Sequence, residues 1–182
     1  MNLMDEIKIN KIETELPTWD LSEIYKDIDD PNIESDIIKI KKLSQDFSTR
    51  WKGKIKDLNA SDFLVCIEKY QNINEKIYTI GTHSNLMFAT NMEDPEISRY
   101  NSSISDKLTE ISSLLVFVTL ELSKIDDKTV DEWTKNNNTI KWLPYLDILR
   151  KRNPYLLDPL VEEMLIEKSA TGRSAWVRLF DE

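Results

Sequence analysis

The sequence predicts an all-α fold, an antiparallel multi-helix array of about six or seven helices with no significant sheet. Apolar residues recur every three or four positions through most of the chain, whereas stretches that alternate apolar and polar residues are hard to find. Only 3 glycines occur in 182 residues, and several apolar stretches begin at residues that favour helix N-caps. No repeat of fixed period is present, so short connections between neighbouring helices are expected.

A single domain is expected to span residues 1–182, with a lead-in segment at 1–30 and a helical body at 31–182. The lead-in segment is predicted to be extended apart from one short helical turn. Asp20 is expected to cap this turn, and Glu23 has the spacing that completes a capping box.

Two long helices are predicted next. The first runs from about residue 32 to 51 and stops before Gly53. The second begins with Ser61 as N-cap and continues through Gly81 to about residue 90, and a glycine inside a helix (about 1 kcal/mol less stable than alanine) predicts a kink or a close helix contact. Their apolar stripes are Ile33, Ile37, Ile40, Leu43 or Ser44, and Phe47 in the first helix, and Phe63, Ile67, Tyr70, Ile77 and Ile80 in the second.

The third helix has the clearest pattern. Asp94 is its predicted N-cap and Pro95 its first residue, where a missing N–H removes no hydrogen bond. The pattern predicts one uninterrupted packing helix of about seven turns that ends at Leu122. Its seam consists of Ile97, Tyr100, Ile104, Leu108, Ile111, Leu115, Val118 and Leu122.

Shorter helices are predicted in the last third of the chain. Thr129 and Glu132 have capping-box spacing and mark the start of a fourth helix, which the asparagine run 136–138 ends. A fifth helix spans about residues 140–152, and the basic run 150–152 complements the negative end of its dipole.

A sixth helix is predicted to begin at Asp158 and Pro159 and to stop at Gly172, and a seventh to follow over residues 173–182. Trp176, Leu179 and Phe180 lie at positions i, i+3 and i+4 of this last helix. An apolar face of this kind needs a surface that buries it. We therefore expect these three residues to form a docking face, either because the chain is cut from a longer polypeptide or because it pairs with another one.

Composition and charge exclude several function classes. The formal net charge is −9 and the pI about 4.8, which disfavours nucleic acid as a partner. The most apolar segment, 114–122, has about nine residues against the roughly twenty that span a bilayer, so no membrane association is expected. Residues 1–10 carry no secretory signal and Cys66 has no second cysteine to pair with, so the cytoplasm is the expected location.

The chain lacks the residues for metal-assisted hydrolysis. A helical zinc-protease site needs two histidines one turn apart with a glutamate between them, and the chain has one histidine, His83. Neither a catalytic residue nor a metal ligand is predicted in this chain. His83 is expected to be a solvent-exposed or hydrogen-bonded helix residue, with a role toward a substrate or partner domain as the alternative. Cys66 lies among apolar residues and is expected to be buried and inert.

Two adjacent acidic pairs, Asp126-Asp127 and Glu162-Glu163, were candidates for acid–base chemistry. Adjacent helix residues point about 100° apart, so neither pair converges on one point. Both pairs are expected to favour helix N-termini instead.

Four stretches of the chain resemble the N-terminal region of oligoendopeptidase F, a family of bacterial zinc metallopeptidases related to thimet oligopeptidase. They are Leu16-Pro17-Thr18-Trp19-Asp20-Leu21, the apolar run 114–122 that ends in Glu121-Leu122, residues 158–165, and residues 167–182, which is the most specific block. One departure is Pro154-Tyr155, where the family pattern has a histidine after the proline.

The resemblance implies an all-helical N-terminal domain that packs on a zinc-bearing catalytic domain and forms part of the wall of a channel for short peptides. The zinc, its ligands and the catalytic glutamate would belong to a downstream region that this chain lacks, so the chain alone would be inactive. The residues that line the channel are not identified by the resemblance. A free-standing helical interaction module that docks through Trp176, Leu179 and Phe180 is the alternative, and an independent enzyme that uses carboxylates is a third hypothesis.

Overall fold

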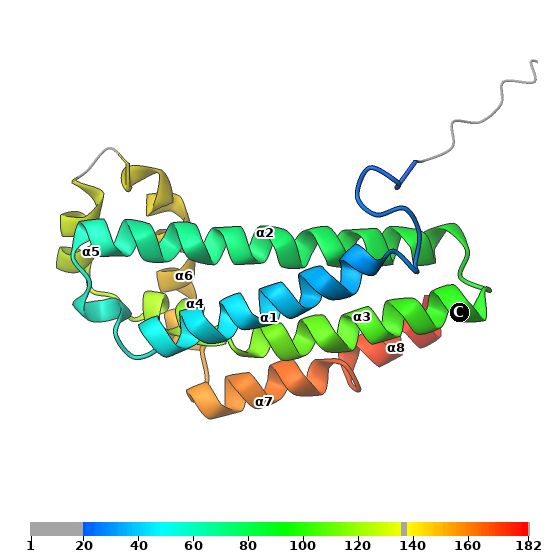
Figure 1. The fold of residues 1–182 in the computed structure, drawn as a ribbon. Coiled ribbons are helices and arrows are strands. Elements are labelled where there is room, and N and C mark those ends of the chain that lie inside the picture. The colour runs from blue at the N-terminus through cyan, green and yellow to red at the C-terminus, as the bar shows by residue number, and fades with distance from the viewer. Residues whose placement is uncertain (1–19, 136–137, 182) are drawn as a thin grey trace, which may run out of the picture.

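The computed structural model describes residues 20–135 and 138–181, and within them the fold is all-α without a strand, as predicted (Figure 1). Short 3-10 turns η1 (Ile55–Asp57), η2 (Ile140–Trp142) and η3 (Asn153–Tyr155) join some of the helices. The α-helices are α1 (Pro31–Trp51), α2 (Ala60–Thr90), α3 (Pro95–Ser113), α4 (Val116–Ser123), α5 (Asp127–Thr134), α6 (Leu143–Arg152), α7 (Pro159–Ser169) and α8 (Arg173–Asp181).

The long helices set the shape of the molecule. α2 runs the length of the fold, and α1 and α3 lie antiparallel to it (Figure 1). α4, α5 and α6 gather at the end where α1 stops and α2 begins, whereas α7 lies along α3 and α8 continues toward the loop that joins α2 to α3. The arrangement is the expected antiparallel array, and it leaves the last two helices on its outside.

Side-chain caps explain where the helices begin. Asp30, Asp94 and Asp158 each accept a backbone N–H from the first turn of the helix that follows, and in each case proline is the first helical residue. Two predicted caps are wrong by two or three positions. The cap of α2 is Asn59, because its Oδ1 accepts the Asp62 N–H at 2.9 Å.

The other displaced cap belongs to α5. Asp126, not Thr129, caps this helix: its Oδ1 accepts the Thr129 N–H at 3.0 Å and its Oδ2 accepts the Thr129 hydroxyl at 2.9 Å. These hydrogen bonds hold the pKa of Asp126 below its usual value. The helix ends at Thr134, and Asn136 and Asn137 of the predicted asparagine stop lie outside the described residues.

The predicted uninterrupted helix to Leu122 is divided into α3 and α4. The Leu114 N–H donates to the Ile111 carbonyl and the Leu115 N–H to the Ser112 carbonyl, so the chain tightens into i→i−3 bonds between Ser113 and Val116. The Ser113 hydroxyl also donates to the Glu110 carbonyl, a contact that bends helices. A straight continuation would bury only one face. The break lets α4 bury residues all round, namely Phe117, Val118, Leu120, Leu122 and Ser123.

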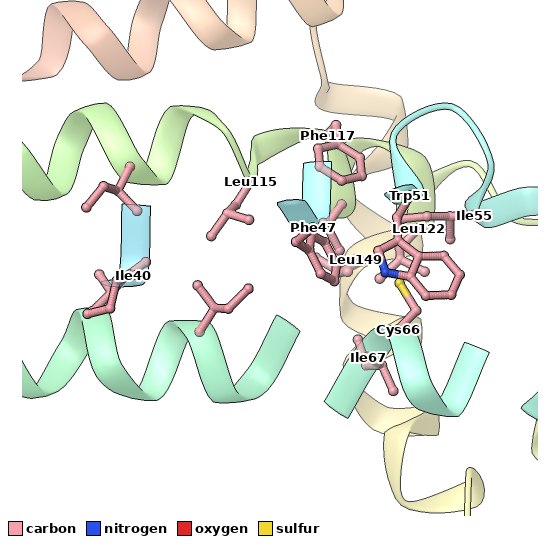
Figure 2. Close-up of a cluster of buried hydrophobic side chains, with 14 of the residues drawn as sticks. Ile40, Phe47, Trp51, Ile55, Cys66, Ile67, Leu115, Phe117, Leu122 and Leu149 are labelled. Carbon is pink, nitrogen blue, oxygen red and sulfur yellow. The ribbon is translucent and has the colours of Figure 1, made fainter. Parts of the chain in front are cut away.

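The core lies between the helices α1 to α6. Phe47 packs among its aromatic side chains, with ring centroids 6.0 Å from Phe117 and 6.4 Å from Trp51 (Figure 2). In the first helix Ser44 is buried whereas Leu43 is 42% exposed, so the serine belongs to the buried stripe. Gly81 leaves α2 unbroken and allows the predicted close contact, since a Cβ there would lie 3.3 Å from Leu108.

Within residues 20–30 the lead-in segment carries the expected turn at 22–24 and a second one at 28–29, where the Asp30 N–H donates to the Asp27 carbonyl at 3.4 Å. The Asp20 carboxylate accepts the Ser22 N–H at 2.9 Å, which makes Asp20 the cap, whereas Glu23 is exposed. Residues 16–19, the first part of the stretch from Leu16 to Leu21 that resembles oligoendopeptidase F, lie outside the described residues. Over the described part of the chain, no helix combines the length and the hydropathy that a bilayer-spanning segment needs.

Candidate functional site

The three residues of the predicted docking face are among the most exposed apolar side chains of the described structure. Trp176 is 72% exposed, Leu179 63% and Phe180 91%. They share one side of α8, because helix positions i, i+3 and i+4 are neighbours on the helix surface. We call these three residues the C-terminal apolar face. No other described segment covers it, and its docking role stays a prediction.

The preceding helix is also poorly covered. Every described residue of α7 keeps part of its surface exposed to solvent, and none is buried. Leu160 is 73% exposed, Met164 50% and Leu165 48%. α7 therefore presents further apolar surface beside the C-terminal apolar face.

Gly172 makes the corner between α7 and α8. Its N–H donates to the Lys168 carbonyl at 2.8 Å, and its own carbonyl accepts the Trp176 N–H at 3.2 Å. A Cβ at this position would lie 2.9 Å from the Lys168 carbonyl oxygen, a separation that real Cβ atoms essentially never show. The glycine thus allows α8 to begin at once after α7 and sets the direction in which Trp176 is presented.

A groove lined by both polar and apolar side chains, here called the α3 groove, lies between the last two helices and the bundle. Its larger part, about 830 Å³, is bounded by the end of α2, the first half of α3 and the α7–α8 corner, and a smaller hollow of about 210 Å³ adjoins it toward α7. The two parts share Asn85, Asn101 and Ser105. Sequence reasoning missed this groove, although Asn101, Ser105, Thr109 and Ser112 recur at helical spacing on α3.

His83 is completely buried and is not a surface residue. Its Nδ1 lies 2.9 Å from the Tyr100 hydroxyl, and the Tyr25 ring packs edge-on to it at 5.3 Å between centroids. The hydrogen-bonded half of the expectation is confirmed and the solvent-exposed half is wrong, because the lead-in segment folds over α2. Burial lowers the pKa of His83, while a backbone contact with Tyr25 and the charges of Asp30 and Asp27 act weakly in the opposite direction.

Tyr25 ties the lead-in segment to the bundle. Its hydroxyl donates to the Asp36 carboxylate at 3.1 Å. Burial, then this hydrogen bond, raises the pKa of Tyr25 to about 12. The contacts of Tyr25 with Asp36 and His83 give the histidine a structural role.

Cys66 has the properties expected of an inert thiol. It is 3% exposed in the core, and burial, then the negative charge of Glu121, raises its pKa to about 12. The thiolate, which is the nucleophilic form, is therefore disfavoured at neutral pH.

The described residues do not fit the zinc site of a peptidase. No group of His, Cys, Asp or Glu side chains among them is arranged to hold a metal ion. The one histidine of the chain is buried and engages Tyr100. The described residues therefore supply no ligand set for a zinc ion that would activate water.

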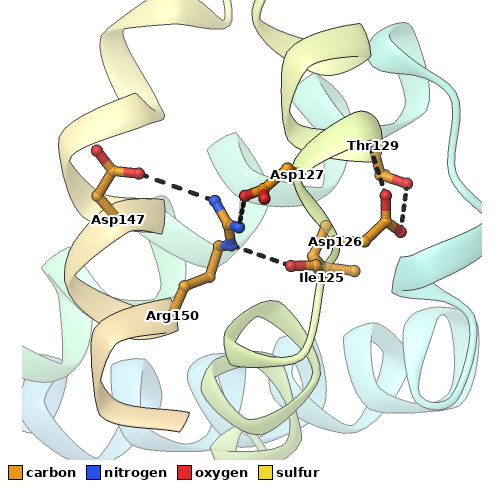
Figure 3. A network of polar contacts seen from close by, with 6 residues as sticks. All are labelled: Ile125, Asp126, Asp127, Thr129, Asp147 and Arg150. Carbon is orange, nitrogen blue, oxygen red and sulfur yellow. Dashed lines mark hydrogen bonds and ion pairs between the residues drawn. The ribbon is translucent and has the colours of Figure 1, made fainter.

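The acidic pair Asp126-Asp127 and the basic residue Arg150 form a structural network (Figure 3). Asp126 caps α5, whereas Asp127 forms an ion pair with Arg150. Arg150 also donates from Nε to the Ile125 carbonyl at 3.0 Å. Arg150 therefore joins α6 to the α4–α5 connection, a role that the prediction of a dipole-complementing helix end did not include.

Glu121 is a residue that sequence reasoning noted without giving it a role. Its two carboxylate oxygens accept the N–H groups of Gly53 at 2.6 Å and Ile55 at 3.1 Å, 68 and 66 residues earlier in the chain. Gly53 has φ = 78°, a conformation that L side chains rarely adopt. Glu121 thus clamps the turn between α1 and η1 onto α4.

Comparison with known protein families gives a match that covers the C-terminal third of the chain. Residues 121–182 match the family model for the N-terminal region of oligopeptidase F. The matched segment begins at Glu121 and contains α5 to α8, including the Arg150 network, the Gly172 corner and the C-terminal apolar face. A comparison with curated proteins and one with solved structures each returned no match.

Proposed function

We propose, from the premise that the chain carries an N-terminal domain of the oligoendopeptidase F family, that it forms one wall of a substrate channel in a zinc metalloendopeptidase that hydrolyses short peptides. The family match over residues 121–182 is the observation that carries the proposal. In such an enzyme zinc activates the attacking water. That ion, its ligands and the general base would come from a catalytic domain, with the complete enzyme working in the cytoplasm.

The chain's own side chains support a role in confining the peptide substrate and in docking on the catalytic domain, rather than a role in the hydrolytic chemistry. His83 is buried against Tyr100, and the Cys66 thiol is protonated at neutral pH because its pKa is raised to about 12. The Asp126 carboxylate is engaged in capping α5. These groups hold the fold together, so the chain by itself is expected to be inactive toward peptides.

The C-terminal apolar face is the proposed contact with the catalytic domain. Fully burying a leucine or phenylalanine side chain contributes about 1.5–3 kcal/mol. Trp176, Leu179 and Phe180 retain most of this surface for a partner, since each is more than 60% exposed. The face also lies inside the segment that matches the family, which makes a domain of the same family the preferred partner.

A reconstitution experiment tests the proposal. The purified chain is assayed with a fluorogenic short peptide, alone and mixed with an oligoendopeptidase F catalytic domain, and its zinc content is measured. We expect no hydrolysis and no stoichiometric zinc for the chain alone, and binding to the catalytic domain that weakens at least tenfold in Trp176→Ala/Phe180→Ala, about 1.4 kcal/mol or more.

Ile38→Ala is the matched control, because Ile38 is 61% exposed on α1, away from the C-terminal helices. This variant should bind as the parent chain does. Peptide cleavage by the chain alone that stops on addition of a chelator would overturn the proposal.

A free-standing interaction module is the second candidate, and the 91% exposure of Phe180 favours it equally. Light scattering separates the two. A chain that does not bind the catalytic domain but forms dimers through Trp176 and Phe180 would support the free-standing interaction module.

A further inference from the structure

The α3 groove extends along most of one side of α3. Its two parts share Asn85, Asn101 and Ser105, so they form one surface that reaches Ser112. From Asn101 to Ser112 a helix rises about 16 Å at 1.5 Å per residue. An extended chain advances about 3.3 Å per residue, so this length matches about five residues of extended peptide.

The lining mixes apolar side chains, such as Phe88 and Val177, with neutral groups that both donate and accept hydrogen bonds. Asn85 and Ser105 form no side-chain hydrogen bond with another described residue. Asn101 is oriented, because its Oδ1 accepts the Ser84 hydroxyl at 2.8 Å and thereby directs its amide nitrogen elsewhere. Side-chain amides and hydroxyls complement the alternating N–H and C=O groups of a peptide main chain.

Charge and size exclude other ligand classes. Asp106 and Arg173 are the charged residues among those lining the larger part, and their charges oppose each other. A phosphate-rich ligand is disfavoured by this balance and by the net charge of −9. The combined hollows, about 830 and 210 Å³, are too large for a single small ion to fill.

We propose that this groove binds the main chain of an extended peptide of about five residues, largely independently of the peptide's side chains, through Asn85, Asn101 and Ser105. This inference rests on the proposed function, because it assigns peptide contact to a particular face of the channel wall. It places the peptide beside, not on, the C-terminal apolar face. Peptide binding in the groove and domain binding at the C-terminal apolar face can therefore be tested separately.

An NMR titration of the full chain tests the proposal. Acetylated and amidated penta-alanine is added to the ¹⁵N-labelled protein, and the side-chain amide signals of Asn85 and Asn101 are followed. We expect saturable shifts of these signals together with backbone amides of α3. A pentapeptide of the same sequence with N-methylated amides should bind at least tenfold more weakly, because it lacks the main-chain donors.

Ser105→Trp provides the groove-filling variant, and Ser103→Trp is its matched control. Both serines are exposed on α3, but only Ser105 lines the groove. The first variant should weaken binding at least tenfold and the second should leave it unchanged. Asn85→Leu, which keeps the groove open, should weaken binding about fivefold, since one net hydrogen bond is worth about 1 kcal/mol.

The groove would be overturned as the binding site if Ser105→Trp bound penta-alanine as tightly as the parent chain does, and if the parent chain bound the N-methylated peptide as tightly as penta-alanine. Shifts confined to α8 would overturn it as well. Failure of the catalytic domain to bind, with peptide binding in the groove intact, would overturn the proposed function and leave the peptide site standing.

Discussion

The bundle formed by α1 to α6 and the C-terminal pair α7–α8 each contain a helix that begins in the same way, but the two regions bury very different amounts of surface. α1 and α7 both start with an aspartate cap followed by proline. Ile40 of α1 is 1% exposed, whereas Leu160 of α7 is 73% exposed. Local sequence therefore suffices to define a helix, and a packing partner decides whether the helix is stabilised.

Helix length separates the C-terminal pair from α2 but not from the whole bundle, since α4, α5 and α6 have only 8, 8 and 10 residues and are stabilised by burial. α7 has 11 residues and α8 has 9. Isolated helices shorter than about 12–15 residues are marginal in water. The C-terminal pair consequently depends on surface contacts that α2, with its 31 residues and a row of buried isoleucines, does not need.

The largest contrast is expected between two tryptophans. Trp133 is 1% exposed, stacks on Phe63 at 4.1 Å and donates from its indole N–H to the Leu58 carbonyl at 2.7 Å. Trp133→Ala should lower the free energy of unfolding by about 3–5 kcal/mol, because it leaves a cavity in the core. Trp176→Ala should change it by less than about 0.5 kcal/mol.

Urea unfolding followed by circular dichroism measures both variants. A loss of several kcal/mol in Trp176→Ala would show that α8 is integrated into the core and would remove the distinction between the two regions.

Two glutamates give the next contrast. Glu121 accepts two backbone N–H groups across the bundle, at 2.6 and 3.1 Å, whereas Glu162 accepts one, from Leu157 at 2.8 Å, on the exposed start of α7. Glu121→Gln should destabilise the protein by about 1.5–3 kcal/mol, because one of the two acceptor oxygens becomes an NH2 donor that faces a backbone N–H, and the other accepts without the help of a charge. Glu162→Gln should have an effect below about 0.5 kcal/mol.

The same denaturation assay compares the two variants, and amide hydrogen exchange at Gly53 and Ile55 should accelerate in Glu121→Gln alone. Unchanged exchange at these two amides would mean that the carboxylate does not hold the turn.

One pH-dependent contribution to the free energy of unfolding comes from His83, which lies in α2 of the bundle. The pKa of His83 is lowered in the folded protein by burial, so the unfolded chain binds the proton more readily than the native one. The stability contributed by neutral His83 is fully present above the unfolded pKa of about 6.5 and is lost as pH falls below it. The effect is at most about 1.4 kcal/mol per pH unit.

Unfolding free energies measured between pH 7.5 and 5 test this, and His83→Gln should flatten the profile because the chain has no other histidine. A wild-type profile already flat over this range would contradict the assignment.

Much of the fold was predictable because its signals are local. Asp94 and Pro95 mark the start of α3, and the apolar spacing gives its buried seam. The caps of α2 and α5 were displaced because Ser61 and Thr129 are also good capping residues, and their neighbours Asn59 and Asp126 supply the acceptor instead. Such competition over two or three residues cannot be resolved from residue type alone.

The candidate sites divide in the same way. Trp176, Leu179 and Phe180 were predictable as one helix face from spacing alone, and their exposure is visible in the structure. The α3 groove was not predictable, because Asn85 of α2 and Ser105 of α3 line one surface only through the antiparallel arrangement of these helices with the α7–α8 corner.

The sequence by itself determined that the chain is helical, where most helices begin, and that one histidine and one cysteine cannot supply a peptidase zinc site. These properties depend on residue counts or on neighbours within one helical turn. Only the tertiary structure decided the break between α3 and α4, the burial of His83 and the partners of Glu121. Each of these depends on groups brought together by folding, such as Glu121 and Gly53, which lie 68 residues apart in the chain.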